Sequence, residues 1–286
     1  MVNNITPKIE SYIKNMPSLP TSVAKVLEVC NNPQTSPADL NHVISLDPVL
    51  VGRVLKLINS AYYGFGQQVT SLVRAIIMLG INTVKNLALS SSIVGNLAKN
   101  KSTAGLNMEG FWRHSLCVGV AAKAIAKKRG VDTKQLEEFF AAGLLHDIGK
   151  IPLNAVLSND YMLTVSSSDR DRLSLVRAED RSLGINHSTV GGMIVNSWKL
   201  EGAVGDTIIY HHNHIEYEGS HKELLYTIIL ANRFALETET GFSGDRHPEM
   251  PGPSIWEALG ITTDIFDEII GGVNGEIEKA EVFLKL

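Results

Sequence analysis

The chain has 286 residues, which is long enough for one large domain or two small ones with a substantial buried core. Hydrophobic residues make up 44% of the chain and charged residues 20%, which is ordinary for a soluble globular protein. The net charge of −4 provides no general attraction to a phosphate backbone, so we expect no nucleic-acid partner.

Two adjacent helix starts in the first half carry the same signal. Ser36 is a good N-cap before Pro37, and Asp47 stands before Pro48 in the same way. Apolar residues at helical spacing accompany these caps and predict short helices within 18–33, 36–48, 47–64, 70–80 and 81–98. We expect these five helices to form a helical bundle over residues 1–100.

The polar, glycine-containing segment 99–110 is the best candidate for a boundary, after which residues 101–286 form a second helical subdomain. Further helices are expected at roughly 111–129, 135–148, 187–199, 203–212, 222–239 and 264–284. The polar span 154–186 could be irregular or carry helical turns, whereas 241–254 is rich in Gly and Pro and is predicted as a loop. No strand-like alternation of any length occurs, so we expect an all-α fold.

Cysteine use and hydropathy indicate where the protein works. Cys30 and Cys117 alone cannot make a disulfide framework or a cysteine-rich zinc site, and their scarcity fits a reducing cytoplasm. Residues 1–17 lack the apolar core of a signal peptide, and apolar runs such as 75–81 are too short to cross a bilayer. We therefore expect a cytoplasmic protein that does not associate with a membrane.

Six of the nine histidines lie in or just beyond helical segments of the second half: His114, His146, His187, His211, His212 and His214. A single histidine on a helix is more often a core or surface residue than a ligand. The pair His211-His212 at a helix end could simply complement the helix dipole. His146-Asp147, however, ends an apolar helix that must be buried, and a desolvated imidazole and carboxylate need partners. A divalent ion is an efficient partner for both groups.

Histidine and carboxylate together suit iron, manganese or zinc better than magnesium or calcium. The spacing is not diagnostic by itself, because four helices would have to converge. Two interpretations of His146-Asp147 therefore stay open. The pair could supply two ligands of a metal ion, or it could be a salt-bridged structural pair in a metal-free core.

The order of these residues resembles that of the HD superfamily of metal-dependent phosphohydrolases, and most closely that of the HD-GYP phosphodiesterases. The first half is similar to something narrower. Its segments MPSLPTSVAKVLEV, SPADLNHVISLDPVLVGRVLKLINSAYYG and VTSLVRAIIMLGINTVKNLAL closely resemble the HDOD family, the HD-related output domain of bacterial signalling proteins. The later segment EDRSLGINHSTVGGMIVNSWKLEGAVGDTIIYHH is similar to the same family, so the resemblance covers about 16–212.

The resemblance implies an N-terminal helical bundle packed on an HD-like helical core, used mainly to transmit signals through protein contacts. Many family members have lost the HD residues and hydrolase activity. This chain resembles the minority that keep them, which implies a site for one or more Fe, Mn or Zn ions with ligands His114, His146, Asp147, His187, His211 and His212. Lys150 matches the lysine that lies near the substrate phosphate in active relatives.

Two departures from the pattern weigh against hydrolysis. The closing aspartate of the superfamily is replaced by Asn232, which can offer an oxygen to a metal but brings no charge and cannot act as a general base. After His212 the chain lacks the Gly-Tyr-Pro element of cyclic dinucleotide phosphodiesterases, and Glu216 and Glu218 add negative charge where a phosphate would approach.

We therefore expect a signal-transduction output or scaffold domain that is not an enzyme but keeps a His/Asp metal site. A signalling protein is its expected partner. The alternative is a metal-dependent phosphohydrolase acting on a nucleotide or phosphodiester, with Lys150 as phosphate contact. Tyr62-Tyr63, in a glycine-bounded turn, could form a contact surface or pack between the two halves.

Overall fold

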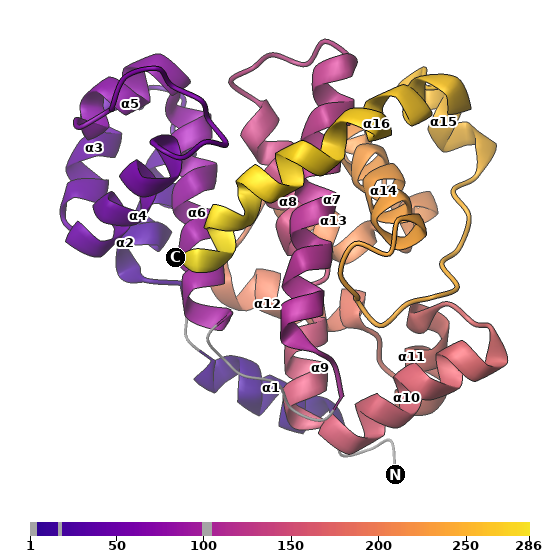
Figure 1. Cartoon of the computed structure of the whole chain (residues 1–286). Helices are drawn as coiled ribbons and strands as arrows, with labels where there is room; N and C mark the ends of the chain where they lie inside the picture. Colours follow the sequence, from indigo (N-terminus) through magenta and orange to yellow (C-terminus); the bar gives the residue numbers. More distant parts are fainter. Residues whose placement is uncertain (1–4, 17–18, 99–104) are drawn as a thin grey trace.

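The computed structural model describes residues 5–16, 19–98 and 105–286. Every regular element within these ranges is a helix, which confirms the predicted all-α fold (Figure 1). Part of the predicted boundary, 99–104, lies outside the described residues, as do positions 17–18 of the first predicted helical segment.

The five helices predicted for the first half are present and pack on one another: α2 (Thr21–Cys30), α3 (Pro37–Ser45), α4 (Pro48–Ile58), α5 (Leu72–Leu79) and α6 (Ile81–Leu97). Their caps act as predicted. Oγ of Ser36 accepts a hydrogen bond from the amide of Asp39, and Oδ1 of Asp47 accepts from the amides of Val49 and Leu50. Local chemistry therefore sets where α3 and α4 begin.

An additional helix, α1 (Ile5–Asn15), was not predicted. It packs against α9 (Lys150–Val156) and α12 (His187–Trp198), at the bottom of Figure 1. The first helix of the chain thus lies beside elements of the second half. The division into 1–100 and 101–286 remains a prediction.

Helix α7 (Met108–Lys128) is the centre of the second half and packs against α8 (Leu136–Leu145), α14 (Lys222–Glu237) and α16 (Thr263–Ala280) (Figure 1). Two glycines allow α7 and α8 to approach closely, because a Cβ on Gly143 would lie 2.7 Å from the Cα of Gly119. This contact fixes the helix that carries His114 against the helix that leads to His146.

The span 154–186, left open by its sequence, is helical: after α9 come α10 (Ser158–Asp171) and α11 (Leu175–Leu183). The remaining elements are α13 (Ala203–Tyr210), η2 (His214–Glu216), α15 (Pro253–Leu259) and η3 (Glu281–Lys285). The predicted loop after α14 is confirmed up to residue 252. We refer to residues 241–252 as the covering segment.

Tyr62 and Tyr63 pack between the two halves. The Tyr62 ring lies 5.7 Å from that of Phe140 and 5.9 Å from that of Phe283. The ammonium of Lys123 stands 4.5 Å above the Tyr62 ring and 5.1 Å from the Tyr63 ring. Of the two interpretations of this turn, the contacts support interior packing.

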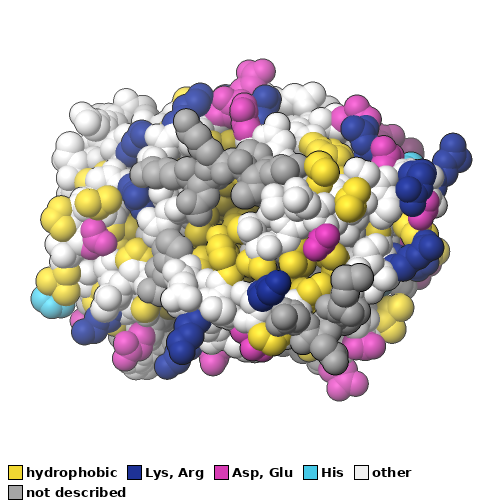
Figure 2. Space-filling view, turned by 90° about the horizontal axis from the view of Figure 1, so that it is seen from below, with side chains coloured by type: hydrophobic (Ala, Val, Ile, Leu, Met, Phe, Trp, Pro, Cys, Tyr) yellow, Lys and Arg dark blue, Asp and Glu magenta, His cyan; other side chains and the backbone are white. Residues whose placement is uncertain are grey.

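Figure 2 shows the face seen from below Figure 1, where acidic and basic side chains are interspersed around a hydrophobic area. Among the described helices, none is by itself long and apolar enough to cross a membrane. Helices α5 and α6 meet that test only together, and the chain bends by 118° between them.

Candidate metal centre

His146 and Asp147 lie in the turn that joins α8 to α9, and both side chains are buried. The turn is pressed against the start of α12, because a Cβ on Gly149 would lie 1.9 Å from the carbonyl oxygen of His187. Only glycine permits this approach. The close contact brings His187 to the carboxylate of Asp147.

Asp147 lies between two groups of histidines, with one carboxylate oxygen facing each group. Oδ1 is 3.3 Å from Nε2 of His187 and 3.6 Å from Nε2 of His211. Oδ2 is 3.3 Å from Nε2 of His146 and 3.9 Å from Nε2 of His114. The predicted histidines therefore converge from α7, α8, α12 and α13, as the metal hypothesis requires.

The cluster divides into two sets of potential ligands that share Asp147: His114 and His146 on one side, and His187, His211 and His212 on the other. Within each set the potential ligand atoms lie within 4.8 Å of one another. A carboxylate that offers one oxygen to each set is suited to bridge two ions.

Hydrogen bonds at the far side of three imidazoles orient the cluster. Nδ1 of His146 lies 2.7 Å from the carbonyl oxygen of Gly143, and Nδ1 of His211 lies 3.0 Å from that of Thr207. Both acceptors require a proton on Nδ1, so the Nε2 lone pairs face Asp147. This is how proteins prepare histidine as a metal ligand.

The third oriented imidazole depends on Glu179, a residue that the sequence analysis missed. Oε2 of Glu179 accepts hydrogen bonds from Nδ1 of His187 at 2.6 Å and from its amide at 2.9 Å. Oε1 accepts from the hydroxyl of Tyr161 at 2.7 Å. A signal was available, because Glu179 lies between Leu175 and Leu183 at i+4 spacing, on the apolar face of α11.

Desolvation favours the neutral form of four histidines of the cluster: His114, His187, His211 and His212. Burial lowers the pKa of His114 to about 3 and lowers the pKa values of His187 and His212 well below their usual range. Burial raises the pKa of Asp147, but His146 and Lys150 outweigh this and bring the net pKa well below its usual range. Neutral imidazoles around a carboxylate are the protonation states that a metal ion requires.

Four polar atoms of the cluster are buried without a hydrogen-bond partner among the described residues: Nε2 of His146, His187 and His211, and Oδ1 of Asp147. Unpartnered buried polar atoms are costly and are rare in folded proteins. Here all four are electron-pair donors that face one another, an arrangement that a cation satisfies and that hydrogen bonding within the cluster does not. The donor set fits a divalent transition metal.

Asn232 and Lys150 complete the predicted set. Oδ1 of Asn232 lies 3.0 Å from Nε2 of His114, so the uncharged residue stands at the edge of the cluster. Nζ of Lys150 lies 2.6 Å from Oδ2 of Asp147 and 3.1 Å from the carbonyl oxygen of Ser243. Lys150 is only 2% exposed, and its amine is directed into the protein.

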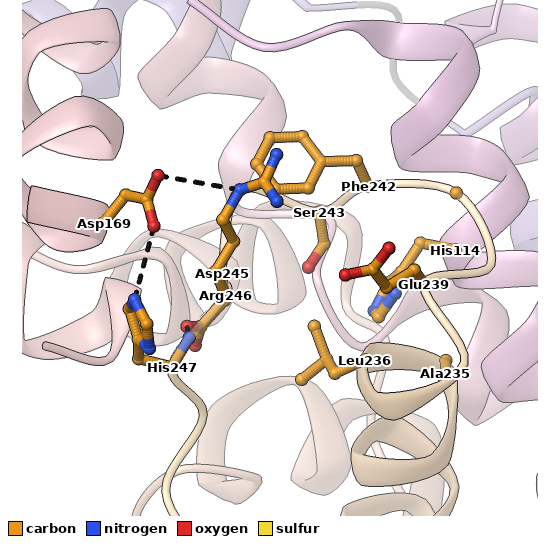
Figure 3. Close-up of a pocket in the computed structure, with 11 residues that line it drawn as sticks. His114, Asp169, Ala235, Leu236, Glu239, Phe242, Ser243, Asp245, Arg246 and His247 are labelled. Atoms are coloured by element: carbon orange, nitrogen blue, oxygen red, sulfur yellow. Dashed lines mark hydrogen bonds and ion pairs between the residues drawn. The ribbon is translucent and has the colours of Figure 1, made fainter. Parts of the chain in front are cut away.

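Cavities reach the cluster from different sides. One of about 450 Å³ adjoins His114 and is lined by the charged residues Asp169, Glu239, Asp245 and Arg246 (Figure 3). Another, of about 630 Å³, is bounded in part by His212. A small one of about 70 Å³ lies between His211, His212, Asn232 and residues 248–251 of the covering segment.

The chain is similar in sequence to a curated protein. A curated relative, an uncharacterised protein from Treponema pallidum (strain Nichols), is 25% identical over 229 residues, which cover 80% of this chain. The chain spans 44% of the length of that relative.

Solved structures share the fold. An HDOD domain protein of unknown function from Geobacter sulfurreducens has 24% identity and a TM-score of 0.70, covering 100% of this chain and 95% of its own. A candidate phosphohydrolase from Shewanella amazonensis SB2B has 24% identity and a TM-score of 0.71, covering 97% and 98%. A candidate signal transduction protein from Marinobacter aquaeolei VT8 has 20% identity and a TM-score of 0.73, covering 99% and 66%.

The family model of the HDOD domain matches residues 16–214, close to the range expected from the sequence motifs. The match extends from the end of α1 through the helical bundle and the histidine cluster to the start of η2. The chain therefore belongs to the HDOD domain family.

Proposed function

We propose that this chain is a signalling module whose His/Asp centre binds one or two divalent transition-metal ions and carries out no hydrolysis. The observation that carries the proposal is the set of four unpartnered buried donor atoms that face one another around Asp147. His114 and His146 would hold one ion with Asp147, and His187, His211 and His212 the other. Iron, manganese and zinc match these ligands.

When bound, metal would hold together the helices that supply its ligands, and it would supply Lewis-acid chemistry to any phosphate that reached it. The chain's own residues favour the first role. His114, His146, His187 and His211 come from four different helices or their ends, and they converge only in the folded chain. Metal binding to this centre would therefore add directly to folding stability.

Three features of the chain weigh against hydrolysis. Asn232 stands beside His114 without a negative charge, so it cannot serve as a general base. Lys150 is buried against Asp147 and does not line the cavity beside His114. That cavity carries the carboxylates of Asp169, Glu239 and Asp245 against the single guanidinium of Arg246, a poor environment for an anionic substrate.

The second candidate function is a metal-dependent phosphohydrolase acting on a nucleotide or phosphodiester. The convergence of the potential ligands favours it, together with a cavity of about 450 Å³ that reaches His114. Two of the fold relatives are described as candidate phosphohydrolases, one of them as metal-dependent. In either case we propose a signalling protein as the partner of this chain.

One preparation tests both functions. Protein purified without a His tag is analysed for Fe, Mn and Zn and then assayed against a generic phosphodiester and cyclic dinucleotides. We expect near-stoichiometric metal and no turnover. Metal content that stays substoichiometric after reconstitution contradicts the proposal, and turnover that depends on the bound metal establishes the second candidate instead.

His146→Ala supplies a matched test of the metal role, with the exposed His42→Ala as control. Saturating metal should stabilise the wild type by about 2.7 kcal/mol at a hundredfold excess over Kd. Most of this increment should disappear in His146→Ala and persist in His42→Ala, as measured by thermal unfolding with and without metal. An equal increment in both variants would show that metal binds elsewhere.

A further inference from the structure

Lys150 connects the metal centre to the covering segment through two contacts. Its ammonium lies 2.6 Å from Oδ2 of Asp147 and donates to the carbonyl oxygen of Ser243 at 3.1 Å. Lys150 and Ser243 are both almost fully buried, so this cation has left water and needs both acceptors. The covering segment is thus attached to the carboxylate at the middle of the histidine cluster.

The covering segment forms an outer wall of the cluster. The amide of Phe242 donates to the carbonyl oxygen of Gly110 at 2.9 Å, which holds the start of the segment against α7 near His114. Figure 3 shows Ser243, Asp245, Arg246 and His247 around the cavity beside His114. Residues 248–251 then line the small cavity against His211, His212 and Asn232.

The ammonium of Lys150 occupies an oxygen that the cluster would offer to a metal. Oδ2 of Asp147 is 3.3 Å from Nε2 of His146 and 3.9 Å from Nε2 of His114. Two positive charges that share one buried oxygen repel each other strongly, because the low dielectric of the interior screens them little. An ion held at Oδ2 by His114 and His146 would therefore weaken the contact between Lys150 and Asp147.

A second carboxylate is available within the covering segment. Asp245 is 6% exposed and accepts a hydrogen bond from the amide of His247 at 2.9 Å. Asp245 stands two residues beyond Ser243, whose carbonyl oxygen lies 3.1 Å from the Lys150 ammonium, so the same short stretch brings this carboxylate toward that ammonium. Burial raises the pKa of Asp245, and the charge of Lys150 opposes this. Asp245 is thus an alternative acceptor for a displaced ammonium, whereas Glu179, which also feels the charge of Lys150, is already engaged by Tyr161 and His187.

We propose that Lys150 exchanges Asp147 for Asp245 when the metal centre is loaded, and that this exchange loosens the covering segment. The inference rests on the proposed metal binding. The contact with the Ser243 carbonyl oxygen weakens as the ammonium moves, and the His247 amide loses its acceptor as Asp245 turns to Lys150. The state of a buried centre is thereby transmitted to a segment at the surface, where Met250 is 70% exposed and accessible to a partner.

Hydrogen exchange followed by mass spectrometry tests the proposal on the full chain, apo and saturated with Mn²⁺. In the wild type, amides of the covering segment should exchange at least about threefold faster in the Mn²⁺-loaded protein than in the apo protein. The effect should be largest at the His247 amide. Lys150→Met should abolish this difference and bind Mn²⁺ more tightly, since the competing cation is gone. Asp245→Asn should bind Mn²⁺ as the wild type does and lack the difference.

The control is Lys127→Met, which replaces an exposed lysine near the end of α7. This variant should retain the wild-type response. Loaded protein whose covering segment exchanges as in the apo form overturns this inference alone. A metal-dependent difference that persists in Lys150→Met or in Asp245→Asn also overturns it. If Mn²⁺ does not bind to the wild type, the proposed function is overturned and this inference with it.

Discussion

Glu179 holds His187 in the orientation that directs Nε2 to Asp147. Its Oε2 lies 2.6 Å from Nδ1 of His187, and Nε2 of that imidazole lies 3.3 Å from Oδ1 of Asp147. The carboxylate also accepts from the His187 amide and from Tyr161, so it is locked by three hydrogen bonds. Such partners of ligating histidines set the tautomer and the basicity of the ligand.

Glu179→Gln should therefore weaken metal binding. We expect an affinity loss of about tenfold to a hundredfold, because the carboxylate acceptor of the His187 Nδ1 proton is replaced by a neutral amide. Titration calorimetry with Mn²⁺ or Zn²⁺ measures the change. The exposed Glu201→Gln is the matched control and should leave the affinity unaltered. Unaltered affinity in Glu179→Gln would mean that Glu179 serves packing alone.

The apo protein should lose stability as the pH falls below about 6.5. Burial lowers the pKa of His114 from 6.5 to about 3 and also lowers those of His187, His211 and His212, so below 6.5 the unfolded chain binds more protons than the folded one. Stability is then lost with falling pH, by about 1.4 kcal/mol per pH unit for each histidine that stays neutral.

Glu179 acts against this trend within the same interval. Burial raises its pKa from 4.5 to about 7, so the folded state holds an extra proton and this group favours folding more as the pH falls. Burial also raises the pKa of Asp245, which acts in the same direction as Glu179. Four histidines outweigh these two carboxylates, and urea unfolding of apo protein should give at least about 2 kcal/mol more stability at about pH 6.5 than at about pH 5. Equal values would show that the histidines are protonated in the folded state.

Asn232→Asp should strengthen metal binding without creating a hydrolase. The new carboxylate would stand where Oδ1 of Asn232 now lies, 3.0 Å from Nε2 of His114, and would add one negative charge to the cluster. We expect metal to bind about tenfold more tightly. Calorimetry measures the affinity for metal, and a phosphodiester assay measures hydrolysis. Turnover that appears only in Asn232→Asp would contradict this prediction and would attribute the missing hydrolysis to Asn232 alone.

Gly149→Ala should disrupt the fold around the metal centre. An added Cβ would lie 1.9 Å from the carbonyl oxygen of His187 and 2.6 Å from the amide of Gly191, and neither backbone can retreat freely. We expect a loss of about 3 kcal/mol or more in the free energy of unfolding. The control is Gly272→Ala in α16, where a Cβ meets nothing within 4 Å, and where alanine should add about 0.5–1 kcal/mol. Chemical denaturation of both variants measures the contrast.

Much of this molecule could be predicted from local patterns. The helices of the first half follow from caps such as Ser36 and Asp47 and from apolar residues three and four positions apart, since these interactions join residues within one turn. His146-Asp147 could also be singled out in advance, because this pair at the end of an apolar helix cannot remain without partners. The other candidate ligands were implied by the resemblance to the HD pattern.

Tertiary structure alone decided which of these residues meet and what else surrounds them. The pairing of Glu179 with His187, the attachment of Lys150 to Asp147 and Ser243, and the position of α1 beside α9 and α12 all depend on contacts between distant parts of the chain. A charged residue such as Glu179 looks like surface in a helix of mixed polarity until another element covers that face. Helical periodicity records which face of a helix is buried, whereas the identity of its neighbour is determined only when the helices pack.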